Sequence, residues 1–232
     1  MMIWQNENYR IYKLRCIRCG CYVIQHGRKY VLVDTSMKIE RKILLDSLKK
    51  NGIPKLDAII LTHYHSDHVG NAAFLSRKFH CNVYASPVYM KELKCGRSSM
   101  PKGNNWLGKL VYQIVMHTSL KHMRFEKIDS VQDIQKFMEL GLLGEDVKLI
   151  STTGHSLDGI AMMIDHKVAI VGDAFIRYPF LRRVSLPWAD NPDAVYDMWD
   201  TLSKERCELY LQGHGALVTY DMIEKSKGVY RR

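Results

Sequence analysis

The sequence predicts an α/β fold in the form of a sheet-rich sandwich, and three observations lead to this prediction. The first third of the 232 residues alternates short apolar runs with turn signals such as His26-Gly27, which is the pattern of consecutive antiparallel strands. Stretches with apolar residues at helical spacing follow some of these runs, for example at residues 38–50. The last third returns to short apolar runs.

Each predicted element has a local cause. Residues 38–50 carry apolar side chains on one helical face, and Asn51 begins a typical helix stop. Residues 56–61 are almost continuously apolar, which is typical of a buried strand. Ser86 and Pro87 are a preferred cap and first residue of a helix. The predicted strands are 10–16, 22–25, 30–33, 56–61, 81–85, 147–150, 160–164, 168–171 and 208–211, and the predicted helices are 38–50, 67–79, 107–122, 193–204 and one that starts at 86.

The length and the hydrophobic content of 47% suit one sizeable core, so we expect a single domain over residues 1–232. Residues 96–105 look like a loop, and no element is predicted for residues 125–146. Because residues 96–146 interrupt the strand pattern, we expect a helical insertion there that shapes a substrate groove through Trp106, Leu107 and Tyr112. The alternative is a helix packed on the outer layer.

The chain has 34 Lys and Arg against 24 Asp and Glu, a formal net charge of +10. This excess favours an anionic partner, although a solvated basic face is the alternative. No stretch approaches the roughly 18 apolar residues that span a membrane, and the first residues lack the apolar core of a signal peptide. We therefore expect a cytoplasmic protein without a membrane partner.

Six cysteines in such a compartment are expected to be thiols rather than disulfides. Cys16, Cys19 and Cys21 lie close together in the sequence. A structural zinc site needs four ligands, and no second cysteine pair with matching spacing follows. The sequence gives this cluster no role.

Four predicted strands are each followed by a segment that contains possible metal ligands. Ligands on loops at strand ends can converge at one edge of a sheet, where the strands hold them rigidly. The alternative is that the histidines are ordinary loop residues and that the first aspartate is a helix cap. The candidate ligands are His63, His65, Asp67 and His68 in the first segment, and His155, Asp173 and His214 in the others.

The order of residues in the first segment has a chemical logic. Imidazole and carboxylate ligands together suit zinc, and also iron or manganese. His63 and His65 can bind one ion, while Asp67 and His68 bind a second ion about 3.5 to 4 Å away, which is the separation found in two-metal hydrolases. Asp173 could then supply a carboxylate shared by both ions.

These segments resemble the metallo-β-lactamase-fold superfamily over residues 20–215. The resemblance implies an αββα four-layer sandwich with a metal groove at the strand ends. It also implies two divalent metal ions per chain, for which we expect zinc, with iron or manganese as alternatives. The implied ligands of the first ion are His63, His65 and His155, those of the second are Asp67, His68 and His214, and Asp173 bridges the two.

The ligand set is similar to that of the glyoxalase II group within this superfamily. Only 18 residues follow His214, too few for the helical glutathione-binding domain of that group. The chain is also too short for the inserted domain of the branch that cleaves RNA and DNA. Asp173 stands where two-zinc β-lactamases carry cysteine, which argues against antibiotic hydrolysis.

The expected function is a dinuclear hydrolase in which a metal-bound hydroxide attacks an ester, thioester or lactone. Asp67 is expected to orient the nucleophile or to accept its proton. One alternative is a phosphodiesterase or nuclease, favoured by the positive charge, although no basic and aromatic platform for a single strand is evident. The others are an iron-dependent oxidoreductase of the same fold and a non-catalytic metal-binding domain. The oligomeric state is not indicated.

Three arginines follow Asp173 closely in the sequence, namely Arg177, Arg182 and Arg183. A loop that leaves a metal ligand starts at the edge of the active site. We therefore expect at least one of the three to bind an anionic part of a small-molecule substrate through paired hydrogen bonds. The alternative is that all three are solvated surface charges.

Overall fold

The computed structural model describes residues 1–117, 123–177 and 183–230, and the chain divides into two compact units. Each unit combines one main sheet with helices and is described on its own. The expectations of a single domain and of an insertion at residues 96–146 remain predictions. The first unit comprises Met1–Ser98 and Arg124–Glu145, and the second comprises Ser99–Met123 and Asp146–Arg232.

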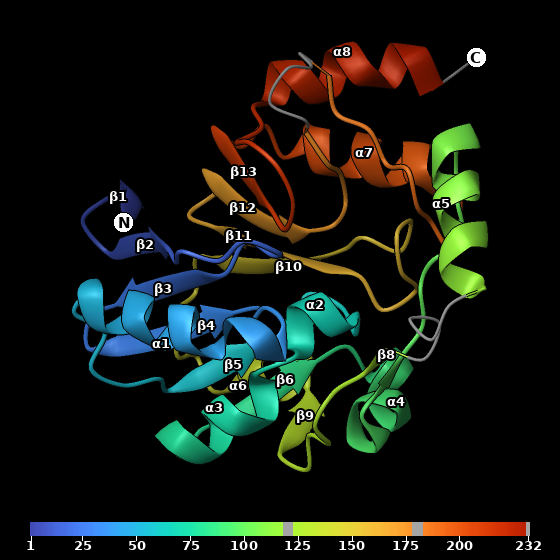
Figure 1. The fold of residues 1–232 in the computed structure, drawn as a ribbon. Helices are drawn as coiled ribbons and strands as arrows, with labels where there is room; N and C mark the ends of the chain where they lie inside the picture. Colours follow the sequence, from blue (N-terminus) through green and yellow to red (C-terminus); the bar gives the residue numbers. More distant parts are fainter. Residues whose placement is uncertain (118–122, 178–182, 231–232) are drawn as a thin grey trace. The chain divides into compact units, whose positions relative to one another are not determined.

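The first unit is built on a seven-stranded sheet with the order β1-β2-β3-β4-β5-β6-β9 among the described residues (Figure 1). The first four strands pair antiparallel, as the turn signals predict. From β4 onwards the neighbours are parallel, so these strands end at the same edge. The bounds are β1 (Met2–Gln5), β2 (Tyr9–Lys13), β3 (Tyr22–His26), β4 (Lys29–Val33), β5 (Ala58–Ile60), β6 (Asn82–Ala85) and β9 (Val131–Asp133).

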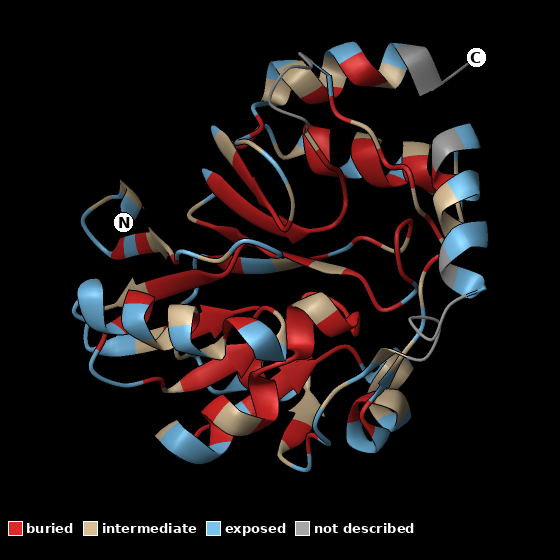
Figure 2. Cartoon of the chain, viewed as in Figure 1, coloured by how far each residue is buried: buried red, intermediate tan, exposed pale blue. Residues whose placement is uncertain are grey.

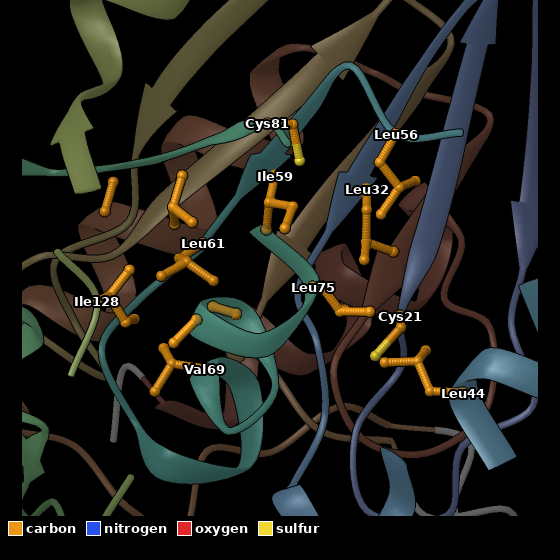
Figure 3. Packing of buried hydrophobic residues seen from close by; sticks show 14 of the residues in the cluster. Cys21, Leu32, Leu44, Leu56, Ile59, Leu61, Val69, Leu75, Cys81 and Ile128 are labelled. Atoms are coloured by element: carbon orange, nitrogen blue, oxygen red, sulfur yellow. The ribbon is translucent and has the colours of Figure 1, made fainter. Parts of the chain in front are cut away.

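Helices cover the sheet of the first unit on both faces. Leu44 of α1 and Leu75 of α3 pack with Ile59 of the sheet in one apolar cluster (Figure 3). On the other face, the ring of Phe137 in α6 lies 5.5 Å from the ring of Tyr84. The helices of this unit are η1 (Lys38–Glu40), α1 (Arg41–Lys50), α2 (Ser66–Val69), α3 (Ala72–Phe79), η2 (Pro87–Tyr89), α4 (Met90–Cys95) and α6 (Ile134–Glu139).

The second unit is built on a four-stranded sheet with the order β10-β11-β12-β13 among its described residues. The indole of Trp199 in α7 is buried and donates a hydrogen bond of 2.7 Å to the carbonyl of Ala174. Figure 2 shows buried residues along α7. α8 lies beside α7, where Lys227 binds Asp200 at 2.8 Å (Figure 1). The elements are α5 (Trp106–Met116), β10 (Val147–Ser151), β11 (Ile160–Ile164), β12 (Val168–Gly172), α7 (Ala194–Lys204), β13 (Leu209–Gln212) and α8 (Tyr220–Tyr230).

Most predicted elements are confirmed, with corrections at their ends. β2 ends at Lys13 rather than at Cys16, because the chain turns into the cysteine-containing loop. The predicted helix at 107–122 is α5, which ends at Met116, and residues 118–122 lie outside the described part. The unassigned stretch contains β9 and α6. Two-residue strands, β7 (Arg97–Ser98) and β8 (Met123–Arg124), stand where the chain passes from one unit to the other.

The predicted helix at 67–79 is wrong in one respect, because the chain breaks it into α2 and α3 at Gly70 and Asn71. A Cβ on Gly70 would lie 2.8 Å from the Ser36 carbonyl oxygen, so the backbones approach too closely for a side chain. The buried amide of Asn71 donates bonds of 2.8 Å to the carbonyls of Thr35 and Met37. These bonds fix the start of α3 to the loop after β4.

We expect Asn71→Ala to lower the free energy of unfolding by about 2 to 3 kcal/mol, because it leaves buried carbonyl groups without their donor. Urea denaturation measures the loss. Asn82→Ala, the same change at an exposed position of β6, should stay within about 0.5 kcal/mol of the parent protein. Equal stability of the two variants would contradict the clamping role of Asn71.

Candidate functional site

The first ligand loop leaves the sheet of the first unit after β5 and enters α2. The rings of His63 and His65 meet edge to face with centroids 4.5 Å apart, and the ring of His68 lies 4.1 Å from that of His63. All three side chains are buried. Oδ2 of Asp67, whose side chain is 30% exposed, lies 4.0 Å from Nε2 of His68. The structure therefore brings four predicted ligands together within the first unit.

The buried carboxylate of Asp34 orients two of these rings. β4 and β5 are parallel neighbours, so Asp34 and Thr62, which come shortly after them, lie at the same edge of the sheet. The backbone N–H and the hydroxyl of Thr62 each donate to Asp34 at 2.8 Å. Nδ1 of His68 donates to the same carboxylate, also at 2.8 Å. One side chain thus ties two strand ends to α2.

These hydrogen bonds fix the tautomers of the rings. A carboxylate oxygen only accepts, so Nδ1 of His68 carries the proton and the lone pair of the neutral ring is on Nε2. The hydroxyl of Thr62 donates to Asp34 and lies 3.0 Å from Nδ1 of His63, from which it therefore accepts. Both rings are in the form that binds a divalent ion through Nε2.

The thiols of the loop between β2 and β3 lie beside this arrangement. Sγ of Cys19 is 3.3 Å from Nδ1 of His68 and donates to the carbonyl of Gly20 at 3.4 Å. A hydrogen bond with Cys21 and burial raise the pKa of Cys16, and burial raises the pKa of Cys21. Both of these thiols are therefore protonated at neutral pH. None of the cysteines in the described residues forms a disulfide.

The second unit brings the other three predicted ligands together. β12 and β13 are parallel, and β10 runs in the same direction as β12 because both pair antiparallel with β11. The segments after these strands carry His155, Asp173 and His214. Oδ2 of Asp173 lies 3.5 Å from Nε2 of His155 and 3.2 Å from Nε2 of His214. Two imidazoles thus converge on one carboxylate oxygen.

The ring of His155 is fixed in the same way as the rings of the first unit. Its Nδ1 lies 2.9 Å from the carbonyl oxygen of Trp188, which only accepts, so the lone pair of the neutral ring is on Nε2 and faces Asp173. A lone pair and a carboxylate oxygen repel each other, and a shared cation or a second proton on the ring relieves this repulsion. Burial raises the pKa of Asp190, whose backbone N–H donates to the carbonyl of His155 at 3.0 Å.

Both sets of donors fit a divalent transition-metal ion. Imidazole nitrogen and carboxylate oxygen are ligands for zinc, iron and manganese. Acceptors behind Nδ1 hold ligating histidines in a fixed orientation in metal sites generally. The donors are His63, His65, Asp67 and His68 in the first unit, and His155, Asp173 and His214 in the second.

The predicted substrate-binding arginines are placed differently from one another. Arg182 lies outside the described residues. The guanidinium of Arg177 donates a bond of 2.6 Å to the carbonyl of Leu217, and its backbone pairs with Gly215, so it holds the loop after β13. Arg183 is exposed.

Sequence reasoning missed Asp34 and the carbonyl of Trp188. Asp34 had a signal, because it directly follows a predicted apolar strand, as the ligand segments do. It has no ligand-type neighbours in the sequence, and its role depends on contacts with residues about 30 positions away. A backbone carbonyl has no sequence signal.

The sequence is similar to those of known proteins. The family profile described as the Metallo-beta-lactamase superfamily matches residues 15–214. A probable metallo-hydrolase of Methanocaldococcus jannaschii is 25% identical over 166 residues, which cover 71% of this chain and 70% of that protein. A probable metallo-hydrolase of Bacillus subtilis is 26% identical over 210 residues, covering 86% and 82%.

The fold is also that of solved structures. An archaeal metallo-beta-lactamase superfamily protein from Sulfolobus tokodaii superposes with a TM-score of 0.67 at 19% identity, covering 93% of this chain and 83% of that one. The predicted fold class, an α/β fold of the metallo-β-lactamase type, is confirmed.

We expect Asp34→Asn to weaken binding of a divalent metal ion by about 10- to 100-fold, because an amide cannot accept all three hydrogen bonds. Asparagine tolerates the positive φ of 60° at this position, so the backbone can persist. Competition with a chromogenic chelator measures the affinity.

Asp165→Asn is the matched control, since Asp165 also has a positive φ, of 51°, but lies in the turn between β11 and β12. It should leave metal affinity unchanged. An Asp34→Asn protein with the affinity of this control would refute the positioning role of Asp34.

Proposed function

We propose that this chain, which belongs to the metallo-beta-lactamase superfamily, is a metal-dependent hydrolase. One observation carries the proposal: the Nε2 atoms of His155 and His214 converge on one oxygen of Asp173. Since the proton of the neutral His155 ring is on Nδ1, this convergence suits a bound cation. The names of the two relatives, both probable metallo-hydrolases, point the same way.

The proposal includes the full ligand set that the sequence implies. We assign two divalent ions, zinc before iron or manganese, because the donors are imidazoles and carboxylates. The geometry within each unit supports a metal-binding role for the ligands of that unit, and the division of the ligands between the two ions follows the family resemblance of the sequence. The first ion is assigned to His63, His65 and His155, the second to Asp67, His68 and His214, and Asp173 to both.

Such ions, when bound, supply Lewis acidity and allow water to lose a proton near neutral pH. The chain supplies the remaining chemistry. The carboxylate of Asp67 is partly exposed, so it can accept a proton from the attacking water. Asp34 and the Trp188 carbonyl hold the protons of His68 and His155 on Nδ1, so these rings are fixed before substrate arrives. The substrate class that we propose is an ester, thioester or lactone.

We also propose that an arginine near the site binds an anionic part of the substrate. The net charge of +10 supports an acidic substrate. Within the described residues Arg183 is the better candidate, because it is exposed whereas the guanidinium of Arg177 is bound to Leu217.

Protein purified without chelator should contain about two metal ions per chain by elemental analysis. It should hydrolyse p-nitrophenyl esters or a thioester, lose that activity after chelation, and regain it when zinc, iron or manganese is returned. A metal-free protein with full activity would overturn the proposal. Turnover of bis-p-nitrophenyl phosphate alone would replace the proposed substrate class with phosphodiesters.

Asp67→Asn should lower kcat by about 10²- to 10⁴-fold, the usual contribution of a positioned proton acceptor. The fold should survive, because the side chain of Asp67 is 30% exposed and asparagine has nearly the same size and shape. Asp193→Asn, an exposed carboxylate at the start of α7, is the matched control and should keep its kcat. If Asp67→Asn behaved like the control, Asp67 would only stabilise the start of its helix.

A further inference from the structure

Helix α5 of the second unit exposes a stripe of large apolar side chains. Trp106, Leu110 and Ile114 follow one another at intervals of four residues, so they line one side of the helix. They are 76%, 51% and 59% exposed. Figure 2 shows that most of the described residues of α5 are exposed. A contiguous apolar surface of this kind usually marks a binding site.

The opposite side of α5 is the side that contacts the rest of the second unit. Gly108 is buried there, and a Cβ on it would lie 2.0 Å from the carbonyl oxygen of Pro187. Val111 and Tyr112 on the same side are half-buried. Just before the helix, Asn104 donates from its backbone to the same carbonyl at 2.7 Å. The helix is therefore anchored by one side, which fixes the apolar stripe on the outside.

The Lys and Arg residues in the segment of sequence that contains α5 are not balanced by acidic residues. Residues 93–125 contain six Lys and Arg and no Asp or Glu. Within the described part of the second unit, Lys102 and Lys109 are exposed. Lys102 also interacts electrostatically with Asp190, whereas Lys109 stands on α5 itself, one turn from Trp106. A helix with an apolar stripe that includes tryptophan, in a basic setting, is typical of segments that lie in a membrane interface.

We infer that the stripe of Trp106, Leu110 and Ile114, with Lys109 beside it, docks onto the surface of a bilayer that contains anionic phospholipid. Two features select this partner. Leu110 and Ile114 are aliphatic, whereas a single-stranded nucleic acid stacks its bases on aromatic side chains. A second copy of the chain would bring one basic segment against another, which like charges oppose.

This inference concerns the surface of the bilayer only. None of the described helices is long and apolar enough to cross a membrane. The sequence predicts no membrane partner because it contains no segment that could span a bilayer, and docking onto the surface of a bilayer does not require such a segment. The inference is independent of the proposed function, since it needs neither metal nor substrate.

Flotation of the full-length protein with vesicles tests the inference. The protein should float with vesicles of phosphatidylcholine and phosphatidylglycerol and stay behind with phosphatidylcholine alone. The double variant Leu110→Glu, Ile114→Glu should lose at least about tenfold in vesicle affinity, because it removes the inserted aliphatic groups. Lys109→Gln should lose roughly fivefold, the usual share of one cation near an anionic surface.

Leu140→Glu is the matched control, because Leu140 is 56% exposed at the end of α6, outside the stripe. It should bind vesicles as the parent does. Circular dichroism and the thermal midpoint establish that each variant is folded, as expected for changes at exposed positions.

Three results would overturn the inference. The first is absence of flotation with anionic vesicles. The second is equal flotation of the double variant and the Leu140→Glu control. The third is loss, in the double variant, of a dimer in light scattering or of binding to a labelled single-stranded oligonucleotide while vesicle binding is unchanged, which would assign the stripe to that other partner.

Discussion

The carboxylate of Asp34 is the constraint on which the first ligand loop depends. It is 1% exposed, and a buried carboxylate is very unfavourable unless donors surround it. Thr62 supplies two donors and His68 supplies the third. Because those donors come from the end of β5 and from α2, the cost of burying Asp34 is offset only when both elements are in place. The same hydrogen bonds therefore hold the end of the sheet to α2 and orient the imidazoles.

The loop that carries Asp34 is joined to His68 by a second set of hydrogen bonds. The backbone N–H and the hydroxyl of Thr35 donate to the carbonyl of His68 at 2.7 and 2.8 Å. Asn71 then binds the carbonyl of Thr35 in return. His68 is thus held at its ring by Asp34 and at its backbone by Thr35, so the ring has little freedom to leave its position. This rigidity is what a site needs if its ligands are to be placed before an ion binds.

The candidate ligands could be predicted from the sequence because each follows a strand whose apolar run is visible by itself. His63 and His155 are examples: the strand before each is predicted close to its observed bounds. The break between α2 and α3 could not be predicted from the sequence. It is determined by the contacts of Gly70 and Asn71 with the loop at residues 35–37, and not by the residues next to them in the chain. Asp34 was missed for the same reason. A pattern in the sequence predicts only what neighbouring residues determine, whereas the roles of Gly70, Asn71 and Asp34 depend on contacts with residues far away in the sequence.

Helices α5 and α7 show that helical periodicity alone does not predict which apolar side chains are buried. Both carry apolar side chains at helical spacing, and burial of one such side chain contributes about 1.5 to 3 kcal/mol. In α7 the largest residue, Trp199, faces the core and is fully buried. In α5 the described residue that is fully buried is Gly108, which lets two backbones approach, while Trp106 faces out. The apolar side chains of Trp106, Leu110 and Ile114 therefore contribute little to the core of their own unit, although their spacing is as regular as that of the buried residues of α7.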